Sequence, residues 1–317
     1  MRTLVAALLA LWALAASAET YPTRPVTIIV PFGAGGPADI YARFLGQRLQ
    51  ASLGQSFVVE DRPGGGSVVG SAAAAQAAPD GYTLLLMSNT HTVNETLLPK
   101  KPFQLMRDFV PVAPINYSDL LLVVHPSVPA HSVKELIALA KSQPGKLFYA
   151  SSGPGTPYHM AGELFKSLAD VDVVHVPHKG SDQARLSILS GQVQMMFDAI
   201  TTMSQNARAG KVRALATSGR ARSAIMPELP TVAEAGVPGY EATIWLGVVA
   251  PKGTPADVVD RLNAEIAKVT TSPDVKEAWA KQGATPLVMT PGEFGQYLRD
   301  DIAKWAKVIA QAGIHRD

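Results

Sequence analysis

The stretch VTIIVPFGAGGPADIYARFLG, Val26 to Gly46, is the part of this chain that decides its fold class. An apolar run ends at Val30-Pro31, a glycine-rich turn follows, and a helical pattern starts near Asp39. A strand, a glycine-rich loop and a helix N-terminus together point free backbone N–H groups at an anion. The stretch therefore predicts an α/β unit with an anion site at its loop.

The first residues have the pattern of a secretory signal peptide. Arg2 supplies the positive region, Leu4 to Ala15 is a short apolar core, and Ala16-Ser17-Ala18 is an A-x-A cleavage site. We expect residues 1–18 to be removed before Glu19. No later segment approaches the roughly 18 apolar residues of a membrane span, so we expect a soluble, exported mature protein.

Composition excludes several classes of function. The chain has no cysteine, which rules out a lipid anchor on cysteine, disulfides and thiolate chemistry. The formal net charge of +2 falls to +1 once Arg2 leaves with the signal peptide, and such a balance argues against a nucleic-acid or membrane-surface partner. A length of 317 residues with 47% hydrophobic residues predicts two domains held by a large core.

Strand-like and helix-like segments alternate along the chain, a pattern typical of an α/β protein with largely parallel sheets. Polar or glycine-rich segments follow several of the predicted strands, where α/β proteins bind ligands. These segments are Gly33–Ala38, Ser88–Asn94, Ser151–Thr156 and Gly180-Ser181. They are rich in neutral hydrogen-bond donors, which suit a carboxylate held without a countercharge.

The opening loop also allows a second interpretation. Gly33-x-Gly35-x-x-Ala38 matches the dinucleotide fingerprint, and an exported α/β enzyme, either a hydrolase or a dinucleotide enzyme, is the alternative function. Against it, Pro31-Phe32 separates the strand from the first glycine, and the charge of Asp39 would repel a pyrophosphate. No hydrolytic or metal-binding motif is present, and we predict neither a cofactor nor a metal site.

Ordered motifs throughout the mature chain resemble the substrate-binding receptors of tripartite tricarboxylate transporters, the Bug family. The motifs are Tyr21-Pro22-x-x-Pro25, Val30-Pro31-Phe32-x-x-Gly35-Gly36-x-x-Asp39, Glu60-Asp61-Arg62-Pro63-Gly64, Ala78-Pro79-Asp80-Gly81-Tyr82-Thr83-Leu84-Leu85, Asp108-Phe109-x-Pro111-Val112, Ser152-Gly153-x-Gly155-Thr156-x-x-His159, Val176-Pro177-x-Lys179-Gly180, Gly191-Gln192-Val193, Leu229-Pro230-Thr231-Val232-x-Glu234-Ala235-Gly236 and Ala250-Pro251-x-Gly253-Thr254-Pro255.

The resemblance implies a periplasmic binding protein of type II, whose two lobes close on a ligand. Each lobe would have a central, mostly parallel sheet flanked by helices. Lobe 1 would comprise residues 19–122 and 246–317, lobe 2 residues 123–245, and the crossings would lie near Leu121–His125 and Thr243–Gly247. The protein would be a monomer that delivers a small organic acid to a membrane permease.

The resemblance also implies where the ligand binds. In lobe 1 the expected ligand-binding residues are Phe32, Gly33, Ala34, Gly35, Gly36, Asp39, Ser88, Asn89 and His91. In lobe 2 they are Ser151, Ser152, Gly153, Thr156, His159, Lys179, Gly180, Ser181 and Asp198. We expect Asp39 mainly to cap the first helix.

The sequence leaves the identity of the acid open. Pro154, Pro157 and His178 depart from residues that are common in the family, and they fall where selectivity is set. Aromatic residues near the predicted cleft would accommodate a flat aromatic acid or wall an aliphatic one; they are Phe32, Tyr41, Tyr158, Phe197 and Trp245.

Overall fold

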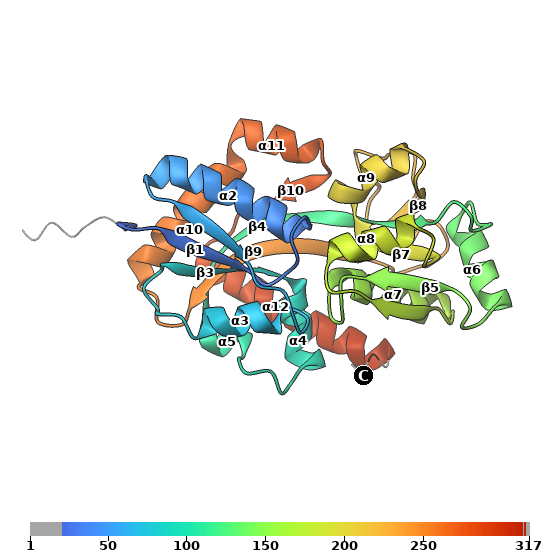
Figure 1. Ribbon diagram of the computed structural model, residues 1–317, viewed down its shortest axis with the longest axis horizontal. Helices are drawn as coiled ribbons and strands as arrows, with labels where there is room; N and C mark the ends of the chain where they lie inside the picture. The colour runs from blue at the N-terminus through green and yellow to red at the C-terminus, as the bar shows by residue number, and fades with distance from the viewer. Residues whose placement is uncertain (1–20, 313, 315–317) are drawn as a thin grey trace, which may run out of the picture.

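The computed structural model describes residues 21–312 and 314, so the predicted signal peptide, residues 1–18, lies outside the described part. The described chain forms two lobes side by side along its longest axis, each with a sheet and packed helices (Figure 1). This arrangement confirms the predicted two-lobed α/β fold. Among the described residues, no helix combines the length and apolar character that crossing a membrane requires.

Two sheets share one long strand. The strands are β1 (Val26–Val30), β2 (Phe57–Asp61), β3 (Thr83–Ser88), β4 (Phe109–Val124), β5 (Phe148–Ser151), β6 (Val174–Pro177), β7 (Met195–Ala199), β8 (Arg213–Thr217), β9 (Thr243–Pro251) and β10 (Ala284–Pro286). The first-lobe sheet has the order β2-β1-β3-β9-β4 with β10 on β4, and the second-lobe sheet has the order β4-β7-β5-β6 with β8 on β4.

Strand β4 changes partners as it passes between the lobes. Residues 109–119 lie antiparallel to β9, whereas residues 120–124 pair with β7 and β8. The expectation of mostly parallel sheets holds for β1–β3 and for β5–β7, but not for these crossing strands. A chain that leaves a lobe along β4 and returns along β9 runs in opposite directions, so their pairing is antiparallel. The predicted lobe boundaries, residues 122/123 and 245/246, stay a prediction.

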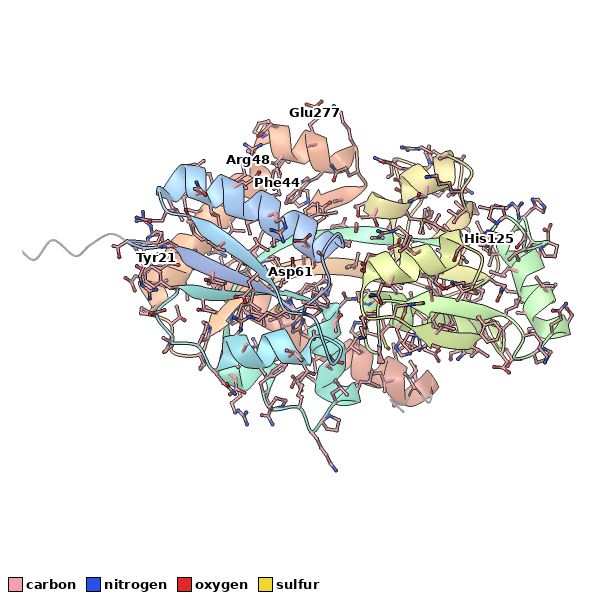
Figure 2. All side chains as sticks on the ribbon, viewed as in Figure 1. Tyr21, Phe44, Arg48, Asp61, His125 and Glu277 are labelled. Atoms are coloured by element: carbon pink, nitrogen blue, oxygen red, sulfur yellow. The ribbon has the colours of Figure 1, made fainter. Side chains whose placement is uncertain are left out.

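Helices cover both faces of each sheet (Figure 1). They are α2 (Pro37–Leu53), α3 (Val68–Ala75), α4 (Asn89–Leu97), α5 (Leu105–Asp108), α6 (Val133–Ser142), α7 (Pro157–Ala169), α8 (Ser181–Leu189), α9 (Ile200–Arg208), α10 (Ala256–Thr271), α11 (Pro273–Ala280) and α12 (Pro291–Ala312). Helix α11 packs on α2, where Trp279 contacts Phe44 with ring centroids 5.6 Å apart and Asp274 lies 2.6 Å from Arg48. Figure 2 labels Phe44 and Arg48 beside α11.

The core follows the alternation of side chains along each strand. In β1, Ile28 is buried in a cluster with α2 and α10, whereas its neighbour Ile29 is buried on the opposite face with α3 and α12. The second lobe has its own cluster, to which residues 120–124 of β4 contribute. Each lobe therefore has a separate core, joined through the crossing strands.

A smaller apolar cluster joins the lobes beside the crossing strands. It contains Val93 and Leu97 of α4, Trp305 and Ile309 of α12, and Met160 of the second-lobe helix α7. Through this cluster the N-terminal half of α7 packs against two helices of the first lobe.

Candidate functional site

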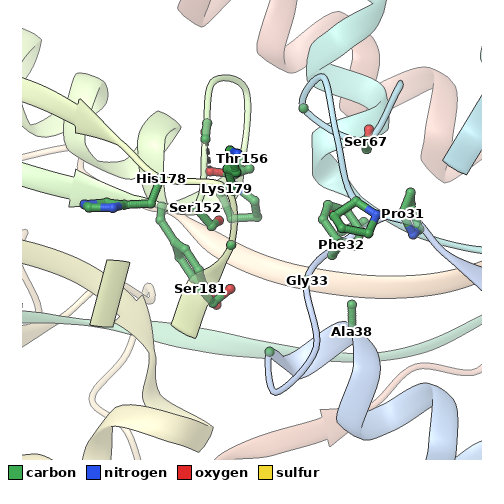
Figure 3. A pocket seen from close by; sticks show the side chains of 18 of the residues that line it. Pro31, Phe32, Gly33, Ala38, Ser67, Ser152, Thr156, His178, Lys179 and Ser181 are labelled. Carbon is green, nitrogen blue, oxygen red and sulfur yellow. Dashed lines mark hydrogen bonds between the residues drawn. The ribbon is translucent and has the colours of Figure 1, made fainter. Parts of the chain in front are cut away.

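A cavity of about 330 Å³ lies between the lobes. Figure 3 shows Phe32 of the first lobe facing Ser152 and Ser181 of the second. Ile244 and Leu246 of the crossing strand β9 also line it. The cavity therefore touches both lobes and one of the segments that joins them.

Five helices begin at this cavity. The N-cap residues of α2, α3, α4, α7 and α8 all line it; they are Gly36, Ser67, Ser88, Thr156 and Gly180. Each helix follows a strand of the parallel part of its sheet, so the helices start at the carboxyl edge where ligands bind in such folds. The first N–H groups of a helix lack intrahelical partners and carry partial positive charge. The cavity is accordingly suited to an anion.

The charges at the cavity reinforce this preference. Of the residues that line it, Lys179 is the one with a full charge at neutral pH, and no aspartate or glutamate is among them. An anion therefore meets no carboxylate in the cavity.

The first-lobe loop is shaped by Gly35 and Asp39. Gly35 has φ +75°, a left-handed conformation that glycine adopts without strain. Its N–H donates to Asp39 Oδ2 at 2.9 Å, while Asp39 Oδ1 lies 2.5 Å from Arg43 Nε. Asp39 thus ties the loop before α2 to the first turn of that helix, but it does not cap the helix as expected, because the N-cap residue is Gly36 and no side chain bonds the cap. It also does not line the cavity.

A second first-lobe loop, residues 63–67, lines the cavity, although the sequence argument did not assign it to the site. Gly64, Gly65, Gly66 and Ser67 all have positive φ, and serine at +76° is unusual because its Cβ disfavours this conformation. Ser67 is held by Ser71, whose hydroxyl donates to the Ser67 carbonyl at 2.8 Å. The available signal was the strand, glycine-rich turn and helix order, which repeats the opening unit.

In the second lobe, histidines support the loop at residues 152–156 from behind. Ser151 Oγ lies 2.6 Å from His175 Nε2 and accepts the N–H of Gly153 at 3.1 Å. His159 Nδ1 accepts the N–H of Gly155 at 3.1 Å, and the His159 and His175 ring centroids are 4.2 Å apart. Burial lowers the pKa of His159 to about 4 and that of His175 to about 3, so both are neutral at pH 7.

Asp198 lies below the cavity rather than in its wall. It is fully buried, and its Oδ2 accepts from Arg185 Nε at 2.8 Å. Arg185 also donates to Thr202 Oγ1 at 3.0 Å. This carboxylate is committed to an ion pair that joins α8 to β7.

The structure brings together about half of the predicted site residues. Those that line the cavity are Phe32, Gly33, Gly36, Ser88, Ser152, Gly153, Thr156, Lys179, Gly180 and Ser181. Those that do not line it are Ala34, Gly35, Asp39, Asn89, His91, Ser151, His159 and Asp198. Five residues outside the expected ligand-binding set were already placed near the cleft by the sequence and do line it: Ala38, Pro154, Pro157, Tyr158 and His178. The residues that line it without such a prediction are Pro31, Pro37, residues 63–67, Ile244 and Leu246.

His91 and Asn89 show why some predicted residues lie outside the cavity. His91 Nε2 lies 2.9 Å from Ser71 Oγ, and its Nδ1 lies 3.2 Å from the backbone of Ser88. Asn89 Nδ2 donates to the carbonyl of Thr243 at 3.0 Å. Both side chains hold the start of α4 in place, and Ser88 alone of the three reaches the cavity wall.

The lobes lie closed on one another around the cavity. A Cβ added to Gly33 would lie 3.4 Å from Gly180 Cα, and one added to Gly66 would lie 2.9 Å from the carbonyl oxygen of Pro154. Each of these pairs joins one lobe to the other. Backbone therefore meets backbone across the cleft, which requires residues without side chains at the seam.

The chain matches the family model described as "Tripartite tricarboxylate transporter family receptor" over residues 41–314. This chain belongs to that receptor family. Protein BugT of Bordetella pertussis is 40% identical over 299 residues, covering 94% of this chain and 92% of BugT.

Two solved receptor structures resemble this chain closely. The structure of Rhodopseudomonas palustris Rpa4515 with adipate has a TM-score of 0.90 and 36% identity, covering 93% of this chain and 99% of Rpa4515. The structure of MatC from the same organism with bound malate has a TM-score of 0.87 and 32% identity, covering 91% of this chain and 100% of MatC.

Membership settles the class of protein. The chain is a solute-binding receptor of the tripartite tricarboxylate transporter type, and the alternative of an exported enzyme is set aside because family and neighbours are receptors. Among the described residues of the receptor, no three histidine, cysteine, aspartate or glutamate side chains group so as to hold a metal ion.

Proposed function

We propose that this receptor captures a small organic carboxylate between its lobes in the periplasm and delivers it to a permease of the tripartite tricarboxylate type. The observation that carries the proposal is the convergence of five helix N-termini, three from one lobe and two from the other, on one cavity free of carboxylates. A carboxylate bound there would draw the lobes together, because each supplies donors. The adipate and malate bound by the two neighbours are acids of this kind.

Ser152 is the side chain best placed to test ligand contact. It lines the cavity, and its hydroxyl has no hydrogen-bond partner among the described residues, so its removal breaks no internal bond. The second-lobe residue Thr156 is less informative because its hydroxyl donates to the carbonyl of Gly153 at 2.7 Å.

The experiment is a calorimetric and thermal-shift screen of the purified protein against aliphatic, aromatic and amino-substituted carboxylic acids, with NAD as the probe that carries a pyrophosphate and no carboxylate. We expect at least one acid to bind and to raise the melting temperature; a ligand at a hundred times its Kd adds about 2.7 kcal/mol of stability. Ser152→Ala should weaken that binding, whereas Ser142→Ala, an exposed position on α6, should not. Absence of binding by every acid would refute the proposal.

Export, assembly and delivery need separate measurements. N-terminal sequencing of protein released by osmotic shock should begin at Glu19, and light scattering should give a monomer. Deleting the gene from its host should abolish uptake of the labelled acid that the screen identifies. Undiminished uptake by the deletion strain would contradict delivery while leaving binding intact.

A further inference from the structure

The cavity carries more positive character than one carboxylate neutralises. A helix N-terminus is equivalent to about half an elementary charge, so five of them amount to roughly two and a half charges. Lys179 adds a further positive charge at the wall, and no residue that lines the cavity opposes them. A dianion compensates more than half of these roughly three and a half charges, whereas a monoanion compensates less than a third.

The positive ends are also divided between the lobes. Helices α2, α3 and α4 begin on one side of the cavity, and α7 and α8 begin on the other. A ligand with one carboxylate toward each lobe would meet donors at both ends. A ligand with a single carboxylate would leave one set of helix ends facing its apolar part.

Among the described residues, no carboxylate lines the cavity to pair with an ammonium group. The two buried aspartates nearest to it are already paired, Asp39 with Arg43 and Asp198 with Arg185. Asp182 is exposed and lies at the seam, where its Oδ1 would be 3.8 Å from a Cβ on Gly33, and it does not line the cavity. An ammonium group would therefore be desolvated beside helix N-termini of its own charge sign.

The cavity is also lined by apolar side chains from both lobes and from a crossing strand. Phe32 comes from the first lobe, Tyr158 and Pro154 from the second, and Ile244 and Leu246 from the strand β9. In β9 the alternate residues Thr243 and Trp245 lie on the other face, where they line a separate groove with α12. The strand thus turns its hydrocarbon side chains to the cavity, a surface that suits a hydrocarbon ligand body.

We propose that this receptor selects a dicarboxylate with an unsubstituted hydrocarbon body over monocarboxylates and over amino-substituted diacids. The inference rests on the proposed function, since it concerns the ligand of the same cavity. It also narrows the identity of the acid, which the sequence left open, because the cavity wall disfavours acids that carry an ammonium group.

The test is a calorimetric comparison of matched acids with the purified protein. The panel contains the straight-chain diacids from succinate to suberate and terephthalate, each with its monoacid and amino-substituted counterpart, for example adipate with hexanoate and 2-aminoadipate. We expect the tightest binder to be a plain diacid, with both counterparts at least about tenfold weaker. A tightest binder with one carboxylate or with an ammonium group would overturn the inference but not the proposed function. If no acid binds, the proposed function itself is refuted.

Adding a negative charge to the cavity wall provides an independent test. Ser152→Asp places a carboxylate in the cavity without breaking an internal hydrogen bond, and Ser152→Asn is its uncharged counterpart of the same size. The aspartate variant should reduce the preference for adipate over 2-aminoadipate at least about tenfold relative to the asparagine variant. Equal preference in the two variants would show that the charge of the wall does not select the ligand.

Discussion

Replacing Gly36 by alanine should weaken ligand binding about 5- to 30-fold without unfolding the receptor. Gly36 is the N-cap of α2 and has φ −86° and ψ 170°, a conformation that alanine adopts without strain. Across the seam, a Cβ at this position would lie 3.1 Å from Ser181 Oγ and 3.6 Å from Ser181 Cβ. The first distance is shorter than an ordinary contact, so either the Ser181 hydroxyl must rotate away or the closed lobes must separate slightly.

The magnitude follows from the cost of overpacking a well-fitted contact. Such a cost is typically about 1–2 kcal/mol for one added methyl group. Because only the closed form carries the contact, the cost appears in the binding free energy, and 1.4 kcal/mol corresponds to a tenfold change in Kd. The unfolding free energy of the ligand-free protein should change by less than about 1 kcal/mol, the difference between glycine and alanine as N-cap residues.

A double-mutant cycle separates closure from direct contact with the ligand. Ser181→Ala removes the oxygen at 3.1 Å and leaves the Cβ at the ordinary distance of 3.6 Å from the alanine at position 36. Titration with the tightest-binding diacid should therefore show that Gly36→Ala costs less in the Ser181→Ala background, with a coupling of about 1 kcal/mol. Gly292→Ala, at a glycine with no atom within 4 Å of the added Cβ, is the matched control. A Gly36→Ala variant with wild-type affinity, or strictly additive variants, would refute the reasoning.

Three further outcomes are expected, each measured by urea unfolding. Asp198→Asn should lower the unfolding free energy by about 3 kcal/mol because it removes the fully buried countercharge of the partly buried Arg185, whereas Asp80→Asn, in an exposed ion pair, should cost less than about 1 kcal/mol. Ser67→Gly should be about 1 kcal/mol more stable than Ser67→Ala, since both lose the hydroxyl but only glycine relieves the left-handed backbone; equal stabilities would contradict this. Burial lowers the pKa of His159 to about 4 and that of His175 to about 3, below the unfolded value of about 6.5. The stability that these two histidines contribute is therefore complete above pH 6.5 and falls as the pH drops toward 4. The slope should reach about 1.4 kcal/mol per pH unit for each histidine, and a His159→Gln variant with the unchanged pH dependence of the wild type would argue against this contribution.

The local order of strand, loop and helix could be predicted from the sequence because short-range physics fixes it. Pro31 ends the first strand, glycines allow the turn, and Pro37 starts the helix with no N–H to satisfy. The same signals were present at residues 151–157, and both loops do reach the cavity. The wall at residues 63–67 had an equivalent signal, but only the parallel pairing of β1 with β2 shows that its helix begins at the same edge.

Side-chain direction could not be predicted in this way. Asp39 and Asp198 are polar residues next to cavity loops, yet both turn to arginines that lie 4 and 13 residues away along the chain. Ile244 and Leu246 were placed in a crossing segment, but which face of that strand meets the ligand depends on its register with β3 and β4. One residue of register exchanges the two faces, and no local pattern in an apolar strand specifies it.

The sequence by itself determined the class of the molecule: an α/β chain with repeated donor loops after its strands, and motifs shared with one receptor family. Only the tertiary structure decided that the four predicted loops and the loop at residues 63–67 meet at one cavity, that its wall holds no carboxylate, and that glycines of both lobes lie at the seam. The physical reason is the separation along the chain of the residues that each property depends on. Turns and helix starts depend on neighbouring residues, whereas the summed field of helix ends and the pairing of charges depend on packing between segments far apart in the chain.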